Sequence, residues 1–129
     1  MLQKIAFIDD EKNVLESLKW LFNDEPYQLF TFNNPAEALD KIMEDEFAVV
    51  VSDQVMPEIE GTKLLQNIKK KWPETECIIM TAHSINKIEN TNNFRIISKP
   101  WDINKFKLAI RDAVSKYEKK YQEKRYSDK

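Results

Sequence analysis

Side chains able to bind a cation and to handle a phosphoryl group follow directly after short apolar runs of this sequence. Listed in chain order, they are Asp9, Asp10, Asp53, Thr81 and Lys99. Oxygen ligands with no histidine or cysteine beside them are typical of Mg²⁺ sites. With such an ion present, a carboxylate can attack phosphorus, and a hydroxyl and an ammonium can hold the remaining phosphoryl oxygens. These residue types therefore predict Mg²⁺-dependent phosphoryl chemistry, provided that the fold brings them together.

Each of these residues also has a purely structural interpretation. Asp10 could cap a helix that starts near Glu11, and Asp53 could open a turn. Thr81 could be an ordinary strand-end hydroxyl and Lys99 a solvated cation. As a group they are harder to explain in this way, because two carboxylates about 4 Å apart repel by about 4 kcal/mol at an effective dielectric constant near 20. A divalent cation removes that repulsion, so the grouping favours a metal site.

Five short apolar runs predict the strands that must position these residues. The runs cover residues 5–8, 29–32, 48–51, 78–80 and 96–97. Four of the five are continuous rather than alternating, as expected for parallel strands buried on both faces. Apolar residues at helical spacing follow the first three runs and the last, whereas the fourth connection is short, polar and rich in asparagine. Alternating strands and helices predict right-handed βαβ units in a three-layer α/β domain.

The predicted sheet places the polar residues at its carboxyl edge. In open α/β sheets, ligands bind outside the carboxyl ends of the strands, at the point where the strand order reverses. If the strand order is 2-1-3-4-5, the residues that follow the first, third, fourth and fifth strands meet at that point. The pattern thus gathers three acids, one hydroxyl and one ammonium in one place.

Composition and charge limit the class of protein. A chain of 129 residues, 42% of them hydrophobic, has the size of one domain with a single core. The net charge of −2 gives no basic field, so direct binding to nucleic acid is not expected. Cys77 is the only cysteine and cannot form an intramolecular disulfide, which favours the cytoplasm. The first apolar run is interrupted at Asp9, so we expect neither a signal peptide nor a membrane span.

Two residues indicate a demanding backbone next to these side chains. Gly61 is the only glycine of the chain, so its position is expected to need either a positive φ or a close backbone approach. An ordinary turn before a helix at Thr62 is the alternative. Pro100 follows Lys99, and a bond to proline tolerates the cis form better than other peptide bonds do. A fixed bend that directs Lys99 toward the acids is therefore expected.

The motifs "IDDE", "SDQVMPEIEG", "TAH" and "SKPWD", in this order and spacing, resemble the receiver domain of two-component response regulators. The resemblance covers nearly the whole chain and implies a flavodoxin-like α/β fold, a three-layer sandwich with a five-stranded parallel sheet in the order 2-1-3-4-5. It implies the following roles: Asp53 as phosphoacceptor, Asp9 and Asp10 as the acidic Mg²⁺ pair, Thr81 as switch hydroxyl, Lys99 as phosphoryl-contacting cation, and the backbone carbonyl of Val55 as a further Mg²⁺ ligand beside Asp53.

The same resemblance implies a signalling function rather than a conventional enzyme. A receiver domain is a phosphoacceptor that assists its own phosphorylation and dephosphorylation. The implied partners are a sensor histidine kinase or phosphotransfer protein, and an output domain or downstream protein. A phosphohydrolase with an aspartate nucleophile would instead need an Asp-x-Asp pattern after the first strand, and "DDEK" does not provide one.

Two departures from the family pattern leave an alternative open. The family has a switch aromatic three residues before the lysine, and this chain has Ile96 there. The interval between Thr81 and Lys99 is shorter than usual by about one helical turn, ~3.6 residues, which predicts a shortened fourth helix. A receiver-like docking module that works without phosphorylation is therefore a second hypothesis.

The end of the chain predicts either a longer last helix or a tail. We assign residues 1–115 to the receiver domain and residues 116–129 to an extension that could lead to an output domain. Tyr117 and Tyr121 lie one helical turn apart on the apolar stripe of the last helix, so an exposed seam could pair two copies as a homodimer. Elsewhere, Trp20 and Trp72 are assigned to the apolar faces of predicted helices and are therefore expected in the core.

Overall fold

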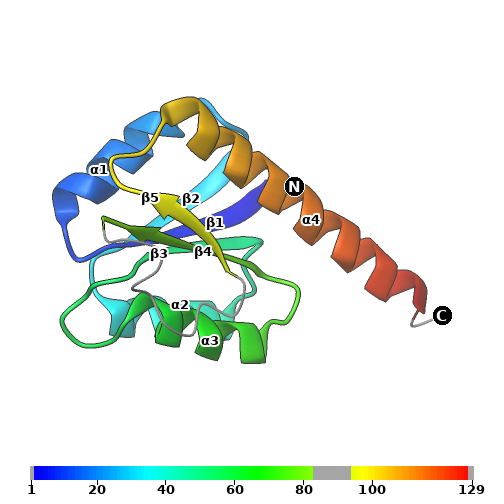
Figure 1. Cartoon of the computed structure of the whole chain (residues 1–129). Helices are drawn as coiled ribbons and strands as arrows, with labels where there is room; N and C mark the ends of the chain where they lie inside the picture. The colour runs from blue at the N-terminus through cyan, green and yellow to red at the C-terminus, as the bar shows by residue number, and fades with distance from the viewer. Residues whose placement is uncertain (1, 83–93, 128–129) are drawn as a thin grey trace.

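The chain folds into a five-stranded parallel sheet with helices on both faces (Figure 1). The computed structural model describes residues 2–82 and 94–127. The strands are β1 (Gln3–Ile8), β2 (Tyr27–Phe32), β3 (Val49–Asp53), β4 (Glu76–Thr81) and β5 (Arg95–Ser98). They lie in the order β2-β1-β3-β4-β5, and each neighbouring pair is parallel. The predicted flavodoxin-like fold and its strand order are confirmed.

Four helices of the described residues complete the three layers. They are α1 (Lys12–Leu21), α2 (Pro35–Glu44), α3 (Gly61–Lys71) and α4 (Ile103–Ser127). Helices α1 and α4 cover one face of the sheet, and α2 and α3 cover the other (Figure 1). The fourth crossover, for which the sequence predicts a shortened helix, falls on residues 83–93 and lies outside the described residues. No helix in the described part of the chain has the length and apolar character needed to cross a bilayer.

Each face of the sheet has its own hydrophobic core, which explains the continuous apolar runs. In β1, Ile5 and Phe7 pack under α1 and α4, whereas Ala6 and Ile8 pack over α2 and α3. All four are fully buried. Because successive side chains of a strand point to opposite faces, a strand covered on both sides must be apolar at every position.

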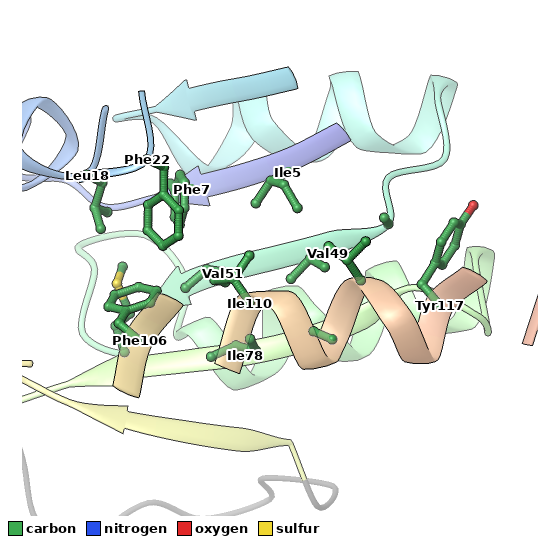
Figure 2. Packing of buried hydrophobic residues seen from close by; sticks show 14 of the residues in the cluster. Ile5, Phe7, Leu18, Phe22, Val49, Val51, Ile78, Phe106, Ile110 and Tyr117 are labelled. Atoms are coloured by element: carbon green, nitrogen blue, oxygen red, sulfur yellow. The ribbon is translucent and has the colours of Figure 1, made fainter. Parts of the chain in front are cut away.

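An aromatic cluster joins β1, α1 and α4 on the first face (Figure 2). The rings of Phe7, Phe22 and Phe106 lie with their centroids 5.4 to 6.3 Å apart. Trp101 and Phe106 are nearly perpendicular, with their centroids 5.1 Å apart. Such tilted and edge-to-face pairs each add about 0.5–1.5 kcal/mol beyond the area that they bury. Because Trp101 follows Lys99 by two residues and packs on Phe106 of α4, the cluster fixes the start of α4 next to the segment that carries Lys99.

The expected burial of Trp20 is wrong. Its side chain is 77% exposed, although α1 buries Leu15 and Leu18. Trp20 lies two positions after Leu18, about 200° around the helix at 100° per residue, so it faces away from the sheet. Trp72 is half-buried at the end of α3, where it packs against the second core and its indole N–H donates to the Ile42 carbonyl at 2.6 Å.

Helix α4 continues along the domain beyond the aromatic cluster and projects past the sheet (Figure 1). Tyr117 is buried, and its hydroxyl donates to Glu46 at 2.9 Å. Burial, followed by the Glu46 carboxylate, raises the pKa of Tyr117, so this hydroxyl stays protonated and able to donate. One turn later, Lys120 forms an ion pair with Glu76. The helix is therefore attached to the amino edge of the sheet, through Glu46 in the loop before β3 and Glu76 at the start of β4.

Replacing Tyr117 with phenylalanine should lower the free energy of unfolding by about 1 kcal/mol, since one hydrogen bond to a carboxylate is lost while the ring remains. Tyr121→Phe is the matched control, because that side chain is 46% exposed and stacks on Tyr117. It should change the free energy by less than about 0.5 kcal/mol. Urea denaturation measures both. Equal effects of the two substitutions would contradict the anchoring role of Tyr117.

Candidate functional site

The residues predicted from the sequence meet at the carboxyl edge of the sheet. Asp9 directly follows β1, Asp53 is the last residue of β3, Thr81 ends β4, and Lys99 directly follows β5. Register explains the meeting, because Asp53 pairs with Met80 across β3 and β4, next to Thr81. Side chains from segments far apart in sequence are thereby brought to one end of the central strands.

Three carboxylates form a tight cluster at this edge. One oxygen each from Asp9, Asp10 and Asp53 can be chosen so that all three lie within 4.8 Å of one another. Asp9 is fully buried and Asp53 is 7% exposed, whereas Asp10 is exposed. Helix α1 begins with Glu11 as its N-cap residue, without a side-chain cap, so the capping role considered for Asp10 is wrong. The cluster has the open side that a hard cation with water ligands needs.

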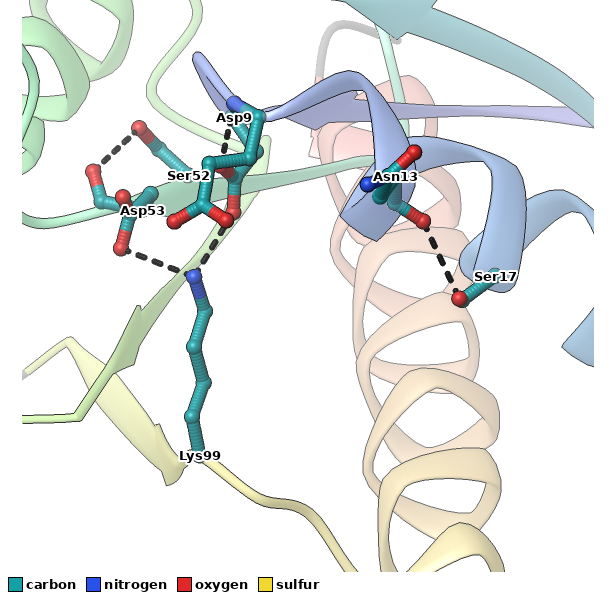
Figure 3. A network of polar contacts seen from close by, with 7 residues as sticks. Asp9, Asn13, Ser17, Ser52, Asp53 and Lys99 are labelled. Carbon is teal, nitrogen blue, oxygen red and sulfur yellow. Dashed lines mark hydrogen bonds and ion pairs between the residues drawn. The ribbon is translucent and has the colours of Figure 1, made fainter.

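The ammonium of Lys99 lies between two of these carboxylates (Figure 3). It donates to Asp9 Oδ2 at 2.8 Å and to Asp53 Oδ1 at 3.3 Å. The other oxygen of Asp9 accepts the Glu11 backbone N–H at 2.9 Å. Both oxygens of the most buried acid are therefore occupied, and the lysine partly offsets the repulsion between the two acids.

The pKa values of the pair reflect this crowding. Burial, followed by the negative charge of Asp9, raises the pKa of Asp53, although Lys99 acts in the opposite direction. Burial also acts to lower the pKa of Lys99, but the hydrogen bond to Asp9 and the charge of Asp53 outweigh it, so this pKa is raised overall. Lys99 therefore stays charged at neutral pH. A charged Asp53, by contrast, is less favourable in the folded domain than in the unfolded chain.

The remaining predicted residues lie around the cluster. Thr81 is 1% exposed, and its carbonyl accepts the Lys99 backbone N–H at 2.8 Å. The side chain of Val55 is 56% exposed in the loop after β3. The Lys99–Pro100 bond is cis, as the sequence allows.

Gly61 permits a close approach of two backbone segments. It does not have a positive φ, so that explanation of the glycine is wrong. A Cβ at this position would lie 2.2 Å from the Asp53 carbonyl oxygen, far inside van der Waals contact. The close backbone approach predicted as the other explanation is confirmed, and α3 begins at Gly61 itself.

Sequence reasoning misses Gln54, which lies between Asp53 and Val55. This side chain is 7% exposed and exchanges two hydrogen bonds with Thr62 at the start of α3. The only available signal is a polar residue inside the "SDQVMPEIEG" motif, eight positions before Thr62. Its partner becomes evident only when α3 is placed against the end of β3.

A family model described as the response regulator receiver domain matches residues 5–111. The chain belongs to this family. Sporulation initiation phosphotransferase F of Bacillus subtilis (strain 168) is 32% identical over 121 residues, which are 91% of this chain and 94% of that protein. The DNA-binding transcriptional regulator NtrC of Escherichia coli (strain K12) is 30% identical over 119 residues, 89% of this chain but 25% of that protein.

A solved receiver domain has the same architecture. The signal receiver domain of an HD domain-containing protein from Pseudomonas fluorescens Pf-5 superposes with a TM-score of 0.87 and 27% identity, over 94% of this chain and 93% of that one. The chain is therefore a phosphoacceptor receiver domain of two-component signalling.

The raised pKa of Asp53 predicts how this carboxylate affects the stability of the receiver domain without metal. Asp53→Asn should raise the free energy of unfolding at pH 7, because a charged carboxylate is less favourable at this site than in the unfolded chain. The gain should shrink as pH falls through the raised pKa, and it should vanish below the ordinary value of 3.8, where Asp53 is protonated in both states.

Denaturation in EDTA across this pH range measures the difference. Asp40→Asn on α2 is the control, since Asp40 is exposed and should contribute less than about 0.5 kcal/mol. A lower stability of Asp53→Asn at neutral pH would contradict the assigned direction.

Proposed function

We propose that Asp53 is the phosphoacceptor of this receiver domain and that Asp9, Asp10 and the Val55 backbone carbonyl bind Mg²⁺ with it. One observation carries the proposal: the Lys99 ammonium bridges Asp9 and Asp53, with Asp10 on the open side of the same cluster. An acid, a cation and an open carboxylate cluster are the groups that phosphoryl transfer needs in one place.

The proposed reaction uses an Asp53 oxygen as nucleophile. It attacks the phosphorus of a phosphohistidine on a sensor kinase or phosphotransfer protein. A phosphorus–oxygen bond forms, the phosphorus–nitrogen bond breaks, and the imidazole leaves with its electron pair and takes up a proton. The nucleophile is the carboxylate form of Asp53, which has no proton to lose, so the attack needs no separate base.

The acidic cluster fits a hard divalent cation. The donors are carboxylate oxygens with one exposed edge, and the described residues place no histidine or cysteine among them. When bound, Mg²⁺ supplies positive charge that offsets the carboxylates and the incoming phosphoryl oxygens. Asp9, the most buried ligand, would keep the site in place through its hydrogen bond from the Glu11 amide.

Lys99 and Thr81 are proposed to act on the phosphorylated state. Lys99 already contacts Asp53 and can transfer that contact to a phosphoryl oxygen without leaving Asp9. The buried Thr81 ends the neighbouring strand, where its hydroxyl is suited to sense the new group. Ile96 is half-buried against the α2 and α3 core, so an aromatic rotation at this position has no part in the proposed switch.

The wider assignment belongs to the same proposal. We infer a cytoplasmic regulatory domain, residues 1–115, which is not a conventional enzyme but assists its own phosphorylation and dephosphorylation. Residues 116–129 would lead to an output domain, a downstream protein or a second copy of the chain. The relatives support this range of partners, because one is a phosphotransferase and another is a transcriptional regulator in which the matched region is one quarter.

Acetyl phosphate with Mg²⁺ should add one phosphoryl group to Asp53, and the adduct should be acid-stable and base-labile as an acyl phosphate is. Lys99→Ala should lower the labelling rate roughly a hundredfold, as the loss of a charge-stabilising donor does in other active sites. Asp53→Asn should not be labelled, whereas the exposed control Asp40→Asn should react like the wild type. Intact-protein mass spectrometry follows the time course.

Three outcomes separate the hypotheses. Labelling of Asp53→Asn at the wild-type rate would refute the assignment of the phosphoacceptor. Labelling in EDTA would refute the role of Mg²⁺. A folded wild type that binds Mg²⁺ but accepts no phosphoryl group from any donor would favour the docking module.

Removing one open ligand should weaken Mg²⁺ binding and leave the fold intact. Asp10→Asn is expected to lower the affinity for Mg²⁺ by about tenfold or more, because the loss of a group that only supports a metal ligand already lowers affinity by about that factor. The variant should be as stable as the wild type or more so in EDTA, because one of three crowded charges is gone. Calorimetric titration with MgCl₂ measures the affinity, with Asp40→Asn as control. Unchanged affinity would exclude Asp10 as a ligand.

A further inference from the structure

Gln54 joins the end of β3 to the start of α3 through its backbone and its side chain. Its backbone N–H donates to the Met80 carbonyl at 3.0 Å, and its carbonyl accepts the Gly61 N–H at 2.9 Å. Its side-chain Oε1 accepts the Thr62 N–H at 3.0 Å, and its Nε2 donates to Thr62 Oγ1 at 3.3 Å. One residue therefore connects β3, β4 and α3 with four hydrogen bonds.

These contacts also complete the first turn of α3. The first N–H groups of a helix lack intrahelical partners, and the N-cap residue Glu60 makes no side-chain cap here. Gln54 accepts from the first two of them, those of Gly61 and Thr62. A backbone N–H can only donate, so Oε1 must face Thr62 and the orientation of the amide is fixed.

The close approach at Gly61 makes the junction compact. With no Cβ, the start of α3 lies directly against the Asp53 and Gln54 backbone, where a methyl group would collide with the Asp53 carbonyl. Gln54 and Thr62 are 7% and 3% exposed, so water does not compete for the amide bonds. Two independent features, the glycine at position 61 and the buried hydrogen bonds between Gln54 and Thr62, thus hold the junction between β3 and α3.

We propose that Gln54 is a positioning residue for the Mg²⁺ site, acting through Val55. Val55 follows Gln54 directly, and its side chain is 56% exposed, so the interior offers it little packing. Val55 therefore lies between two fixed residues, the buried Met56, which packs in the core against α2 and α3, and Gln54, which is held by hydrogen bonds. Gln54 fixes the peptide on the Asp53 side of Val55, and we infer that it sets the orientation of the Val55 carbonyl together with Met56. This inference rests on the proposed function, in which the Val55 carbonyl binds Mg²⁺ with Asp53.

If Gln54 positions the metal ligand, its loss should affect the affinity for Mg²⁺ but not the phosphoryl transfer to Asp53. The Asp53 carboxylate is held by Lys99, whereas the Gln54 side chain bonds to Thr62. Loss of the amide should therefore loosen the carbonyl ligand and leave the nucleophile in place. A residue that only stabilised the fold would not produce this separation.

The test compares Gln54→Leu with Thr75→Val. Leucine removes both amide bonds at similar volume. Thr75 is fully buried at the opposite edge of the sheet, where its hydroxyl donates to the Phe47 carbonyl at 2.6 Å, so its loss matches the loss of a buried hydrogen bond far from the site. Gln54→Leu should weaken Mg²⁺ binding about ten- to a hundredfold, and Thr75→Val should not change it.

Two further readouts complete the experiment. At saturating Mg²⁺, Gln54→Leu should accept phosphate from acetyl phosphate at a rate within about threefold of wild type, since the bound site is then restored. In EDTA, the Thr62 amide should exchange its hydrogen faster in this variant, because its acceptor is gone. In Gln54→Glu the carboxylate still accepts from the Thr62 amide, and the Thr62 hydroxyl, which accepts from Gln54 in the wild type, can donate to it instead. This variant should bind Mg²⁺ at least as well as wild type.

The outcomes distinguish this inference from the proposed function. Wild type that binds Mg²⁺ and is labelled at Asp53, with equal Mg²⁺ affinity in Gln54→Leu, would overturn the role of Gln54 alone. An equal loss of affinity in Thr75→Val would do the same. Wild type that binds no Mg²⁺ would overturn both. If Gln54→Leu does not fold, Thr62→Val removes only the hydroxyl partner, and unchanged affinity in that variant would overturn the inference.

Discussion

The ion pair that Lys99 forms with both Asp9 and Asp53 is the interaction on which the carboxyl edge depends. It links the segment after β5 to the carboxyl ends of β1 and β3. Within the described residues, one ammonium faces three carboxylates, so the charges there remain unbalanced. This imbalance is consistent with the proposed role of the edge, in which a cation and a phosphoryl group act on an ion pair that is already part of the fold.

Around this charge pair, the backbone allows little freedom. Gly61 brings α3 against the Asp53 carbonyl, and Gln54 closes the junction with a buried amide. The aromatic cluster under Trp101 holds the opposite flank behind Lys99. The acids thus lie between two rigid supports, as required when ligands must be held in place before a metal binds.

Strand order, strand ends and clustered acids could be predicted because each depends on local pattern: a doubly covered strand is apolar throughout, and the first polar residue after it marks the carboxyl edge. Trp20 was mispredicted because membership of an amphipathic helix was taken for membership of its apolar face. Gln54 could not be predicted, since its partner Thr62 comes near only after α3 docks. For Gly61, sequence alone could not distinguish a positive φ from a close approach.

Helix α4 starts near the carboxyl edge of the sheet and projects past the opposite edge (Figure 1). Tyr117 anchors it there through its hydrogen bond to Glu46. Its 25 residues span about 37 Å at 1.5 Å per residue, so one continuous helix runs across the domain. Each added residue turns the far end by about 100°. The direction in which the helix points a residue beyond Tyr117 is consequently set by the number of residues in between. A one-residue insertion after Tyr117 would rotate whatever follows it by about 100° about the helix axis, without altering the receiver domain itself.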